Sequence, residues 1–264
     1  MSVNVMSSKR NRLSKIAIQA LVGLLCFCIR PGSGNHTATG PSLRIGKLPR
    51  TTLWAWERPE DLHAVNPATT AVAYLDQTIL LGPSVISKPR RQPLAYPVSA
   101  TRIAVVRMEA LPGTKFEPDY GPKVVDLLLQ SAGKPGIAAL QVDFDATHSQ
   151  REFYAGVLRE LRRRMPPDLP LSITALASWC SYDNWIAGLP VDEAVPMFFR
   201  MEPDRHRAPA DARHFVVREP LCMGSVGVST SEIWPEGMAT KRVYVFADRG
   251  WDEDLALLTE RKLP

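Results

Sequence analysis

Short apolar runs alternate with amphipathic stretches along most of this chain. Eight of the apolar runs have the length and the β-branched or aromatic content that are typical of strands. They cover residues 51–57, 70–76, 102–109, 136–147, 171–177, 194–201, 224–229 and 242–248. Apolar residues at helical spacing predict helices over 120–132, 150–165 and 252–261, and shorter helical segments after Pro59, around Trp185 and over 208–217.

Strands separated by helices indicate a parallel sheet, which is either an open doubly wound sheet or a closed barrel. Eight predicted strands, with no Gly-rich phosphate loop after an early strand, favour the barrel. Residues 78–98 contain several prolines and no helical period, which predicts a β-hairpin in place of a helix after the second strand. We therefore expect an α/β fold, an irregular (β/α)8 TIM-like barrel, formed by residues 51–264 as a single domain.

The N-terminal region has the pattern of a processing segment. Basic residues precede an apolar run from Ile16 to Ile29, which at about 14 residues is shorter than the roughly 20 residues that cross a membrane. We interpret residues 1–34 as a signal peptide or N-terminal anchor and residues 35–50 as a linker. A buried N-terminal helix is the alternative. The expected location is secreted or periplasmic, with membrane contact only through an uncleaved N-terminal segment.

The charge and the cysteine content give little information about the function of the protein. Much of the +5 net charge lies in the first 15 residues and in short clusters. Because no basic stripe is interleaved with aromatic residues, we expect no nucleic-acid partner. Cys180 and Cys222 are the cysteines outside the apolar run, and they either pair in an oxidising compartment or are buried separately. No Cys/His spacing resembles a zinc site, so we predict neither a metal nor a cofactor.

The stretch from Gly136 to Thr147 (GIAALQVDFDAT) contains the most informative polar residues. It reads as a buried strand that ends with Asp143 and Asp145. Side chains two residues apart share one face of a strand, and catalytic residues of α/β barrels lie at the carboxyl ends of the strands. Two like charges on an inward face are costly unless they are paired or used. Either these aspartates form a catalytic centre or Arg107 pairs with them structurally.

Other predicted strand ends supply the remaining candidates. Besides Asp145 and Asp143, the candidate catalytic carboxylates are Glu109, Asp76 and Glu57. The candidate substrate-binding residues are Trp54, Trp56, Tyr74, Arg107 and Trp179. Aromatic faces pack on sugar rings, and cleavage of a glycosidic bond needs two carboxyl groups. We therefore expect a carbohydrate or cell-envelope glycan partner and chemistry like that of glycoside hydrolases. This requires a second carboxyl that faces Asp145 and is not held in a salt bridge.

A short motif resembles one known enzyme family. VDFDA at 142–146 is similar to the D-x-x-D-x-D-x-E pattern on the fourth strand of chitinase-type glycoside hydrolases. Asp143 and Asp145 match its middle and last aspartates, whereas Leu140 and Thr147 replace the first aspartate and the terminal glutamate. That glutamate is the acid in the family, so the resemblance does not support a chitinase mechanism here.

A wider resemblance covers residues 50–264, which are similar to an uncharacterised family of bacterial secreted proteins, a domain of unknown function. The segments that carry it are LWAWERPEDL at 53–62, QVDFDA at 141–146, LSITALASWC at 171–180, VDEAVPMFFRM at 191–201 and GVST at 227–230. The resemblance implies a barrel related to glycoside hydrolases but no established activity.

Two alternatives to a glycosidase remain open. The first is a non-catalytic barrel that binds a glycan or an envelope partner through Trp54, Trp56, Tyr74 and Trp179. The second is metal-assisted hydrolysis by Asp76, Glu109, Asp143 and Asp145. A serine hydrolase is not predicted, because residues 224–229 lack the G-x-S-x-G spacing.

Overall fold

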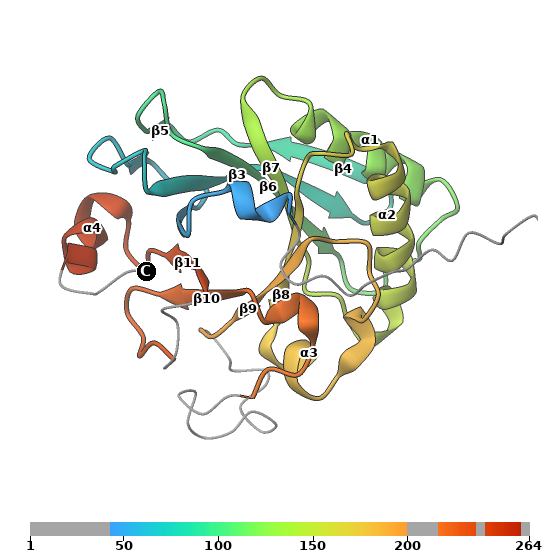
Figure 1. Cartoon of the computed structure of the whole chain (residues 1–264). Coiled ribbons are helices and arrows are strands. Elements are labelled where there is room, and N and C mark those ends of the chain that lie inside the picture. Colours follow the sequence, from blue (N-terminus) through green and yellow to red (C-terminus); the bar gives the residue numbers. More distant parts are fainter. Residues whose placement is uncertain (1–42, 200–215, 236–240, 260–264) are drawn as a thin grey trace, which may run out of the picture. The chain divides into compact units, whose positions relative to one another are not determined.

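The computed structural model describes residues 43–199, 216–235 and 241–259, and eight parallel strands within them form a closed ring (Figure 1). In order around the ring these are β1 (Thr51–Ala55), β3 (Thr70–Leu81), β6 (Arg102–Ala110), β7 (Ile137–Asp143), β8 (Leu171–Leu176), β9 (Glu193–Met197), β10 (Ser225–Ser229) and β11 (Arg242–Phe246). The last of them, β11, pairs with β1 and closes the ring. The predicted α/β barrel is therefore confirmed.

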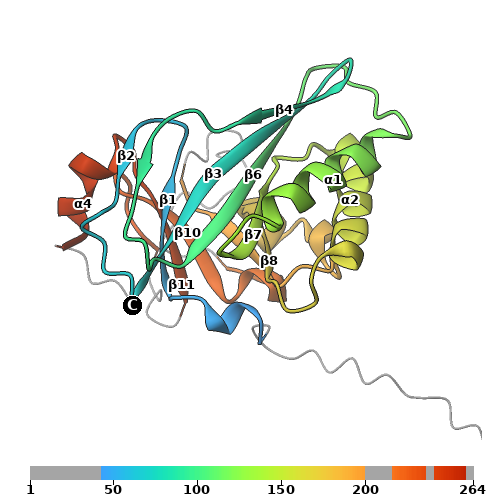
Figure 2. The ribbon, with the colours of Figure 1, turned by 90° about the horizontal axis from the view of Figure 1, so that it is seen from above.

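Two long helices cover one flank of the barrel. The first, α1 (Tyr120–Ala132), connects β6 to β7, and α2 (Arg151–Arg164) connects β7 to β8. They lie side by side (Figures 1 and 2) and bury apolar side chains such as Val124 and Leu158 against the outer face of the strands. Both were predicted almost to the residue, because their apolar positions recur with helical spacing. Two shorter helices, α3 (Ala177–Ser181) and α4 (Trp251–Thr259), follow β8 and β11.

The connection after the second barrel strand is the predicted hairpin. Strand β3 continues beyond the barrel to Leu81 and pairs antiparallel with β4 (Val85–Pro89), so β3 is longer than the sequence suggested. Figure 2 shows these two strands next to β6. The pairing of β3 with β6 shifts by one residue between Leu75 and Gln77, which makes Asp76 the extra residue of a bulge.

Several local predictions differ from the structure. The segment after Pro59 is not helical: Glu60–Asp61 form β2, which pairs with β5 (Leu94–Ala95). The sixth barrel strand ends at Met197 rather than at residue 201, and the predicted helix over 208–217 lies almost entirely outside the described residues. The short helix around Trp185 is a 3-10 turn over Asn184–Ile186.

One end of the barrel is closed by a 3-10 turn, Ile45–Lys47, at the amino ends of the strands. Arg242, the first residue of β11, donates hydrogen bonds to the carbonyl oxygens of Ile45 and Leu48. Both apolar side chains are buried in the barrel interior. Packing against the barrel therefore begins inside the segment expected to be a linker, while the predicted signal or anchor segment lies outside the described residues. No helix in the described ranges is long and apolar enough to span a membrane.

A disulfide joins two connections outside the ring. Cys180 in α3 is bonded to Cys222, which ends a 3-10 turn at Pro220–Cys222, and the two Cα atoms are 5.8 Å apart. Of the two alternatives for these cysteines, the structure shows the pair.

Candidate active site

The open end of the barrel contains a pocket of about 290 Å³ at the carboxyl ends of the strands. Its lining comes from nearly every side of the ring and combines aromatic, acidic and cationic side chains. The lining residues are Trp54, Trp56, Arg58, Arg107, Asp143, Asp145, Thr174, Leu176, Met197, Phe199, Ser229, Phe246, Ala247 and Asp248. Five of the ten residues predicted for the site are therefore brought together here.

Asp143, the last residue of β7, is held firmly on the pocket wall. One carboxylate oxygen lies 2.8 Å from Nη1 of Arg107, and the other accepts a hydrogen bond of 2.7 Å from the hydroxyl of Thr174. Arg107 also pairs with Glu109 at 2.7 Å. Burial disfavours the charge on Arg107, but Asp143 and Glu109 outweigh it and raise the pKa of the guanidinium. The structural pairing considered for Arg107 is therefore present, and it leaves Asp143 with a fixed orientation.

Asp145 lies two residues further along the same face, and its environment is different. Its carboxylate is 4.0 Å from Nη2 of Arg107, and 59% of its side chain is exposed through the pocket mouth. Partial removal from water and the charge of Asp143 raise the pKa of Asp145, and the more distant Arg107 only partly opposes this rise. The carboxyl of Asp145 therefore binds its proton more tightly than a free aspartate does.

Aromatic side chains form another wall of the pocket. The ring centroid of Trp54 lies 4.6 Å from that of Trp56 and 5.0 Å from that of Phe246, which in turn lies 4.6 Å from Phe199. The indole N–H of Trp54 donates to the side-chain oxygen of Gln141 at 2.8 Å. Because this hydrogen bond is buried, it fixes the central ring of the wall.

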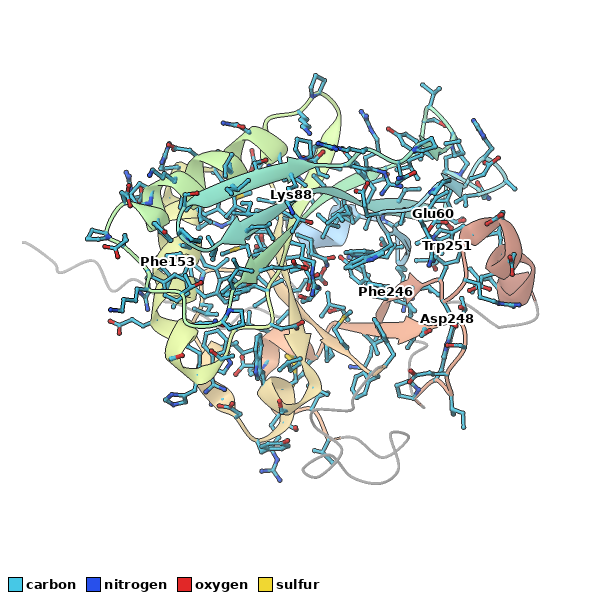
Figure 3. All side chains as sticks on the ribbon, turned by 180° about the vertical axis from the view of Figure 1, so that it is seen from behind. Glu60, Lys88, Phe153, Phe246, Asp248 and Trp251 are labelled. Atoms are coloured by element: carbon cyan, nitrogen blue, oxygen red, sulfur yellow. A yellow bond between two sulfur atoms is a disulfide. The ribbon has the colours of Figure 1, made fainter. Side chains whose placement is uncertain are left out.

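Asp248 lines the pocket from the loop after β11, at the other end of the sequence. Figure 3 shows it close to Phe246, two residues earlier in the chain. Arg58 donates to the backbone carbonyls of Ala247 at 2.8 Å and Asp248 at 3.1 Å. The same guanidinium pairs with Glu60 at 2.7 Å. These contacts tie the loop that carries Asp248 to the loop after β1.

Glu60 extends this network to helix α4. Its second oxygen accepts the backbone N–H of Trp251 at 2.8 Å, and the two residues lie together at the start of α4 in Figure 3. An acidic side chain at a helix amino end satisfies an otherwise free N–H group. The sequence suggested a helix here, whereas the structure uses Glu60 to cap a helix almost 200 residues away.

Two residues predicted for the site on β3 lie on the outside of the barrel. Because Ala73 and Leu75 face the interior, Tyr74 faces outward, and burial together with the charge of Asp76 raises its pKa to about 12. Asp76 accepts hydrogen bonds from Ser131 of α1 at 2.7 Å and from Lys134 at 2.5 Å. The prediction that these two residues belong to the site is therefore corrected.

Three further predicted residues are also absent from the pocket lining. Glu57 follows Trp56 in the chain and therefore points to the opposite face. There its carboxylate accepts hydrogen bonds from the backbone N–H groups of Arg91 and Gln92. Glu109 reaches the pocket only through its pairing with Arg107. Trp179 is 2% exposed and packs edge-on against Trp185 in the outer core. Asp248, which is not among the predicted catalytic carboxylates, is the third carboxylate of the described pocket lining, beside Asp143 and Asp145.

Of the four carboxylates required for metal-assisted hydrolysis, Glu109, Asp143 and Asp145 lie around the guanidinium of Arg107, and Asp76 lies apart from them. Asp76 faces α1, whereas Asp143 and Asp145 face the pocket. Within the described ranges, no group of three or more His, Cys, Asp or Glu side chains has the geometry to hold a metal ion.

Comparison with known proteins finds a family model that matches part of the chain. Residues 101–197 match DUF3142, a domain of unknown function. The DUF3142 match runs from β6 to the end of β9, and it agrees with the resemblance to a domain of unknown function that the sequence indicated. No curated protein matches the sequence.

Two solved structures are similar to the chain at low identity. The spore cortex-lytic enzyme SleL of Bacillus cereus has a TM-score of 0.46 and 15% identity, over 70% of this chain and 54% of that one. The chitinase domain of the spore coat protein CotE from Clostridium difficile has a TM-score of 0.39 and 12% identity, over 86% of this chain and 66% of that one. The chain thus spans less than two thirds of the length of either structure.

Proposed function

We propose that the protein is a carbohydrate-active enzyme that cleaves a glycosidic bond in the pocket at the open end of the barrel. One observation carries this proposal: the carboxyl of Asp145, with its raised pKa, opens onto an aromatic-lined pocket beside a carboxylate that is already fixed by Arg107 and Thr174. Acid-catalysed glycoside cleavage needs a carboxyl group that can donate a proton beside a second acidic group, and a raised pKa favours the proton-donating form.

Each residue of the pocket then has a distinct role. Asp145 donates a proton to the glycosidic oxygen, while Asp143 orients Asp145 and raises its pKa. Asp248, in the loop after β11, serves as the second carboxylate that acts on the sugar as base or nucleophile. The rings of Trp56 and Phe246 support the sugar face. The anomeric configuration of the first product distinguishes the two roles of Asp248.

The target is a glycan outside the cytoplasm. The Cys180–Cys222 disulfide and the apolar run over residues 16–29 both support a secreted or periplasmic location, because disulfides persist in oxidising compartments. A cell-envelope glycan is therefore the substrate class that we propose to test first.

The test is a hydrolysis screen against envelope and plant glycans, using the wild type together with Asp145→Asn and Asp248→Asn. Loss of the acid or of the second carboxylate should lower kcat by about 10²- to 10⁴-fold. Asp168→Asn is the matched control, because it removes an exposed carboxylate from the loop before β8, at the closed end of the barrel. Full activity of Asp145→Asn on a substrate that the wild type cleaves would exclude Asp145 as the acid.

A non-catalytic glycan-binding barrel is the second candidate, and one observation favours it. Thr147, which stands where chitinase-type enzymes carry their acid, begins a 3-10 turn over His148–Gln150 and donates its backbone N–H to the side chain of Gln150 at 2.8 Å. In this case the wild type binds a glycan without cleaving it, and Asp145→Asn binds that glycan with unchanged affinity.

A further inference from the structure

A chain of buried polar side chains runs through the barrel interior between the aromatic wall and the closed end. It begins at Trp54, whose indole N–H donates to Oε1 of Gln141 at 2.8 Å. The amide nitrogen of Gln141 donates in turn to the hydroxyl of Ser172 at 3.1 Å. All three residues are almost completely buried. Because the oxygen and the nitrogen of the Gln141 amide are both engaged, the orientation of this side chain is fixed.

The chain continues to Glu193, the first residue of β9. Tyr244 donates its hydroxyl to Oε1 of Glu193 at 2.5 Å, and Nε of Arg242 lies 3.6 Å from the other oxygen. Burial raises the pKa of Glu193 despite the opposing charge of Arg242. Side-chain hydrogen bonds from Tyr244 and Ser172 also oppose this rise. Ser172 therefore links the amide of Gln141 to the carboxylate of Glu193.

Arg242 anchors the other end of the chain to the backbone. Its guanidinium donates to the carbonyl oxygens of Ile45 at 2.5 Å and Leu48 at 2.9 Å. The neighbouring side chains of the barrel interior are mostly apolar, among them Ala73 and Val195, and they offer no replacement for a lost hydrogen bond. A buried polar group without a partner is costly, so the polar side chains favour the arrangement that pairs them.

We propose that Gln141 is a positioning residue of the pocket, which holds the indole of Trp54 in place for a sugar ring through this buried polar chain. Trp54 lies between Trp56 and Phe246, with ring centroids 4.6 and 5.0 Å away, so a tilt of its ring displaces the whole wall. The wall is thus formed before a ligand arrives, which lowers the entropic cost of binding. This inference rests on the proposed function in that the wall receives a sugar, but the position of Trp54 is measured without one.

The indole N–H signal of Trp54 in a ¹H–¹⁵N spectrum of the full chain tests the inference. Its absence in Trp54→Phe identifies it among the signals of the six tryptophans. Gln141→Met keeps the length of the side chain but removes the acceptor oxygen. We expect the signal to move upfield and the N–H to exchange with solvent about five- to tenfold faster. Gln141→Glu keeps an acceptor oxygen and should restore most of the wild-type exchange rate.

Variants further along the chain distinguish a connected network from local packing. Ser172→Ala and Tyr244→Phe each remove one hydroxyl group of the chain. Both should accelerate exchange of the Trp54 N–H, Ser172→Ala by about threefold or more and Tyr244→Phe by a smaller factor. Thr52→Val is the matched control, because it removes a buried hydroxyl two residues from Trp54 that has no hydrogen-bond partner among the described residues. It should leave the Trp54 signal and its exchange rate unchanged.

The outcomes decide between positioning and general packing. An unchanged Trp54 signal in Gln141→Met would overturn the inference, and so would an equal response to Ser172→Ala and Thr52→Val or no response to Tyr244→Phe. Cooperative thermal unfolding establishes that each variant is folded. If Gln141→Met does not fold, Ser172→Ala and its Thr52→Val control decide the question.

The same measurements separate this inference from the enzymatic function, because they need no substrate. If the variants respond as expected but no glycan is hydrolysed, the positioning of Trp54 holds and the hydrolytic function fails. Hydrolysis by the wild type together with a Trp54 signal that ignores Gln141→Met has the opposite meaning.

Discussion

A single residue, Arg107, organises the acidic side of the pocket. It lies within ion-pair distance of Glu109, Asp143 and Asp145, and its guanidinium stands over the ring of Trp56. The excess of carboxylates in this part of the barrel is tolerated because one cation neutralises part of it while the pocket opens to solvent. Asp143 lies 2.8 Å from this cation and is held in a fixed orientation, whereas Asp145 lies 4.0 Å away and is more exposed.

Replacement of Arg107 by Gln should lower the free energy of unfolding by about 1.5–3 kcal/mol, because buried Asp143 loses its charged partner. The pKa of Asp145 should rise further, since Arg107 is the group that lowers it. Urea denaturation measures the first effect, and the pH dependence of hydrolysis measures the second. Arg107→Lys, which keeps the charge, should show a smaller change in both; an identical loss in the two variants would contradict this account.

The raised pKa of Asp145 predicts the pH dependence of both activity and stability. An acid catalyst must be protonated, so hydrolysis should decline as the pH rises through this raised pKa. The folded state binds this proton more tightly than the unfolded state, whose pKa is near 3.8. The stabilisation is therefore complete below that value and is lost as the pH rises through the folded pKa. The free energies of unfolding of the wild type and of Asp145→Asn should be compared from pH 3.5 to 7. The value for the wild type should fall relative to the value for the variant as the pH rises.

Alternation along the strands correctly predicted which of several side chains point into the barrel. Trp54, Trp56, Asp143 and Asp145 lie on inward positions that follow from a period of two. The same rule places Tyr74 and Glu57 on outward positions. A position at the end of a strand therefore does not by itself show that a side chain faces the barrel interior. Asp248 ends the strand predicted over 242–248, where Arg242, Tyr244 and Phe246 precede it at alternate positions, but it was not among the carboxylates expected to act with Asp145. The partners of Asp76 depend on a bulge and on α1, which no local pattern reveals.

At the scale of elements, strand β7 depends on the glycine that precedes it. Gly136 has φ of +71°, a left-handed conformation that other residues adopt only at a cost. A Cβ atom at this position would lie 1.9 Å from Nη2 of Arg102, whose guanidinium donates to the carbonyl of Pro135. The turn therefore sets the start of the strand that carries Asp143.

Gly136→Ala should therefore lower the free energy of unfolding by about 1–2 kcal/mol. Gly156→Ala is the matched control, because this glycine lies on the exposed side of α2 and a Cβ there meets no atom within 4 Å. The control should stabilise the protein by about 0.5–1 kcal/mol through helix propensity. Chemical denaturation of both variants measures the difference, and a neutral Gly136→Ala variant would show that the turn relaxes without strain.

Elements with a regular period were predicted well, and elements that depend on distant partners were not. The apolar faces of α1 and α2 recur with helical spacing, so their bounds were found from sequence alone. The segment after Pro59 looked like a helix start, but Glu60 instead pairs with Arg58 and caps α4. Such long-range partners are set by the closure of the ring, which a local window does not contain.

At the scale of the whole molecule, the barrel was predictable because eight strand signals recur with helical or hairpin connections between them. The order of the strands in the ring follows the chain, and only β11 pairing with β1 is fully non-local. The disulfide was one of two alternatives, since two cysteines in a sequence carry no information on their separation in space. The structure places their Cα atoms 5.8 Å apart.

Loss of the disulfide should destabilise the whole domain. Cys180 and Cys222 are separated by 42 residues, so the bond restricts a long segment of the unfolded chain. We expect a Cys180→Ser/Cys222→Ser variant to lose about 2–4 kcal/mol of unfolding free energy. Denaturation in the absence and presence of reductant measures this in the wild type, and the double variant should be insensitive to reductant. A wild type that is equally stable under both conditions would contradict the prediction.

Closure of the ring leaves one strand with an open side, and this has a consequence for solubility. Among the described strands of the sheet, β4 pairs only with β3, so its outer edge presents unpaired backbone groups that another chain could join. Exposed Ile86 would favour such joining, whereas Lys88 and Pro89, both exposed, oppose it by charge and by a missing N–H group. Figure 3 shows Lys88 on this strand. The long hairpin therefore carries its own protection against self-association into aggregates.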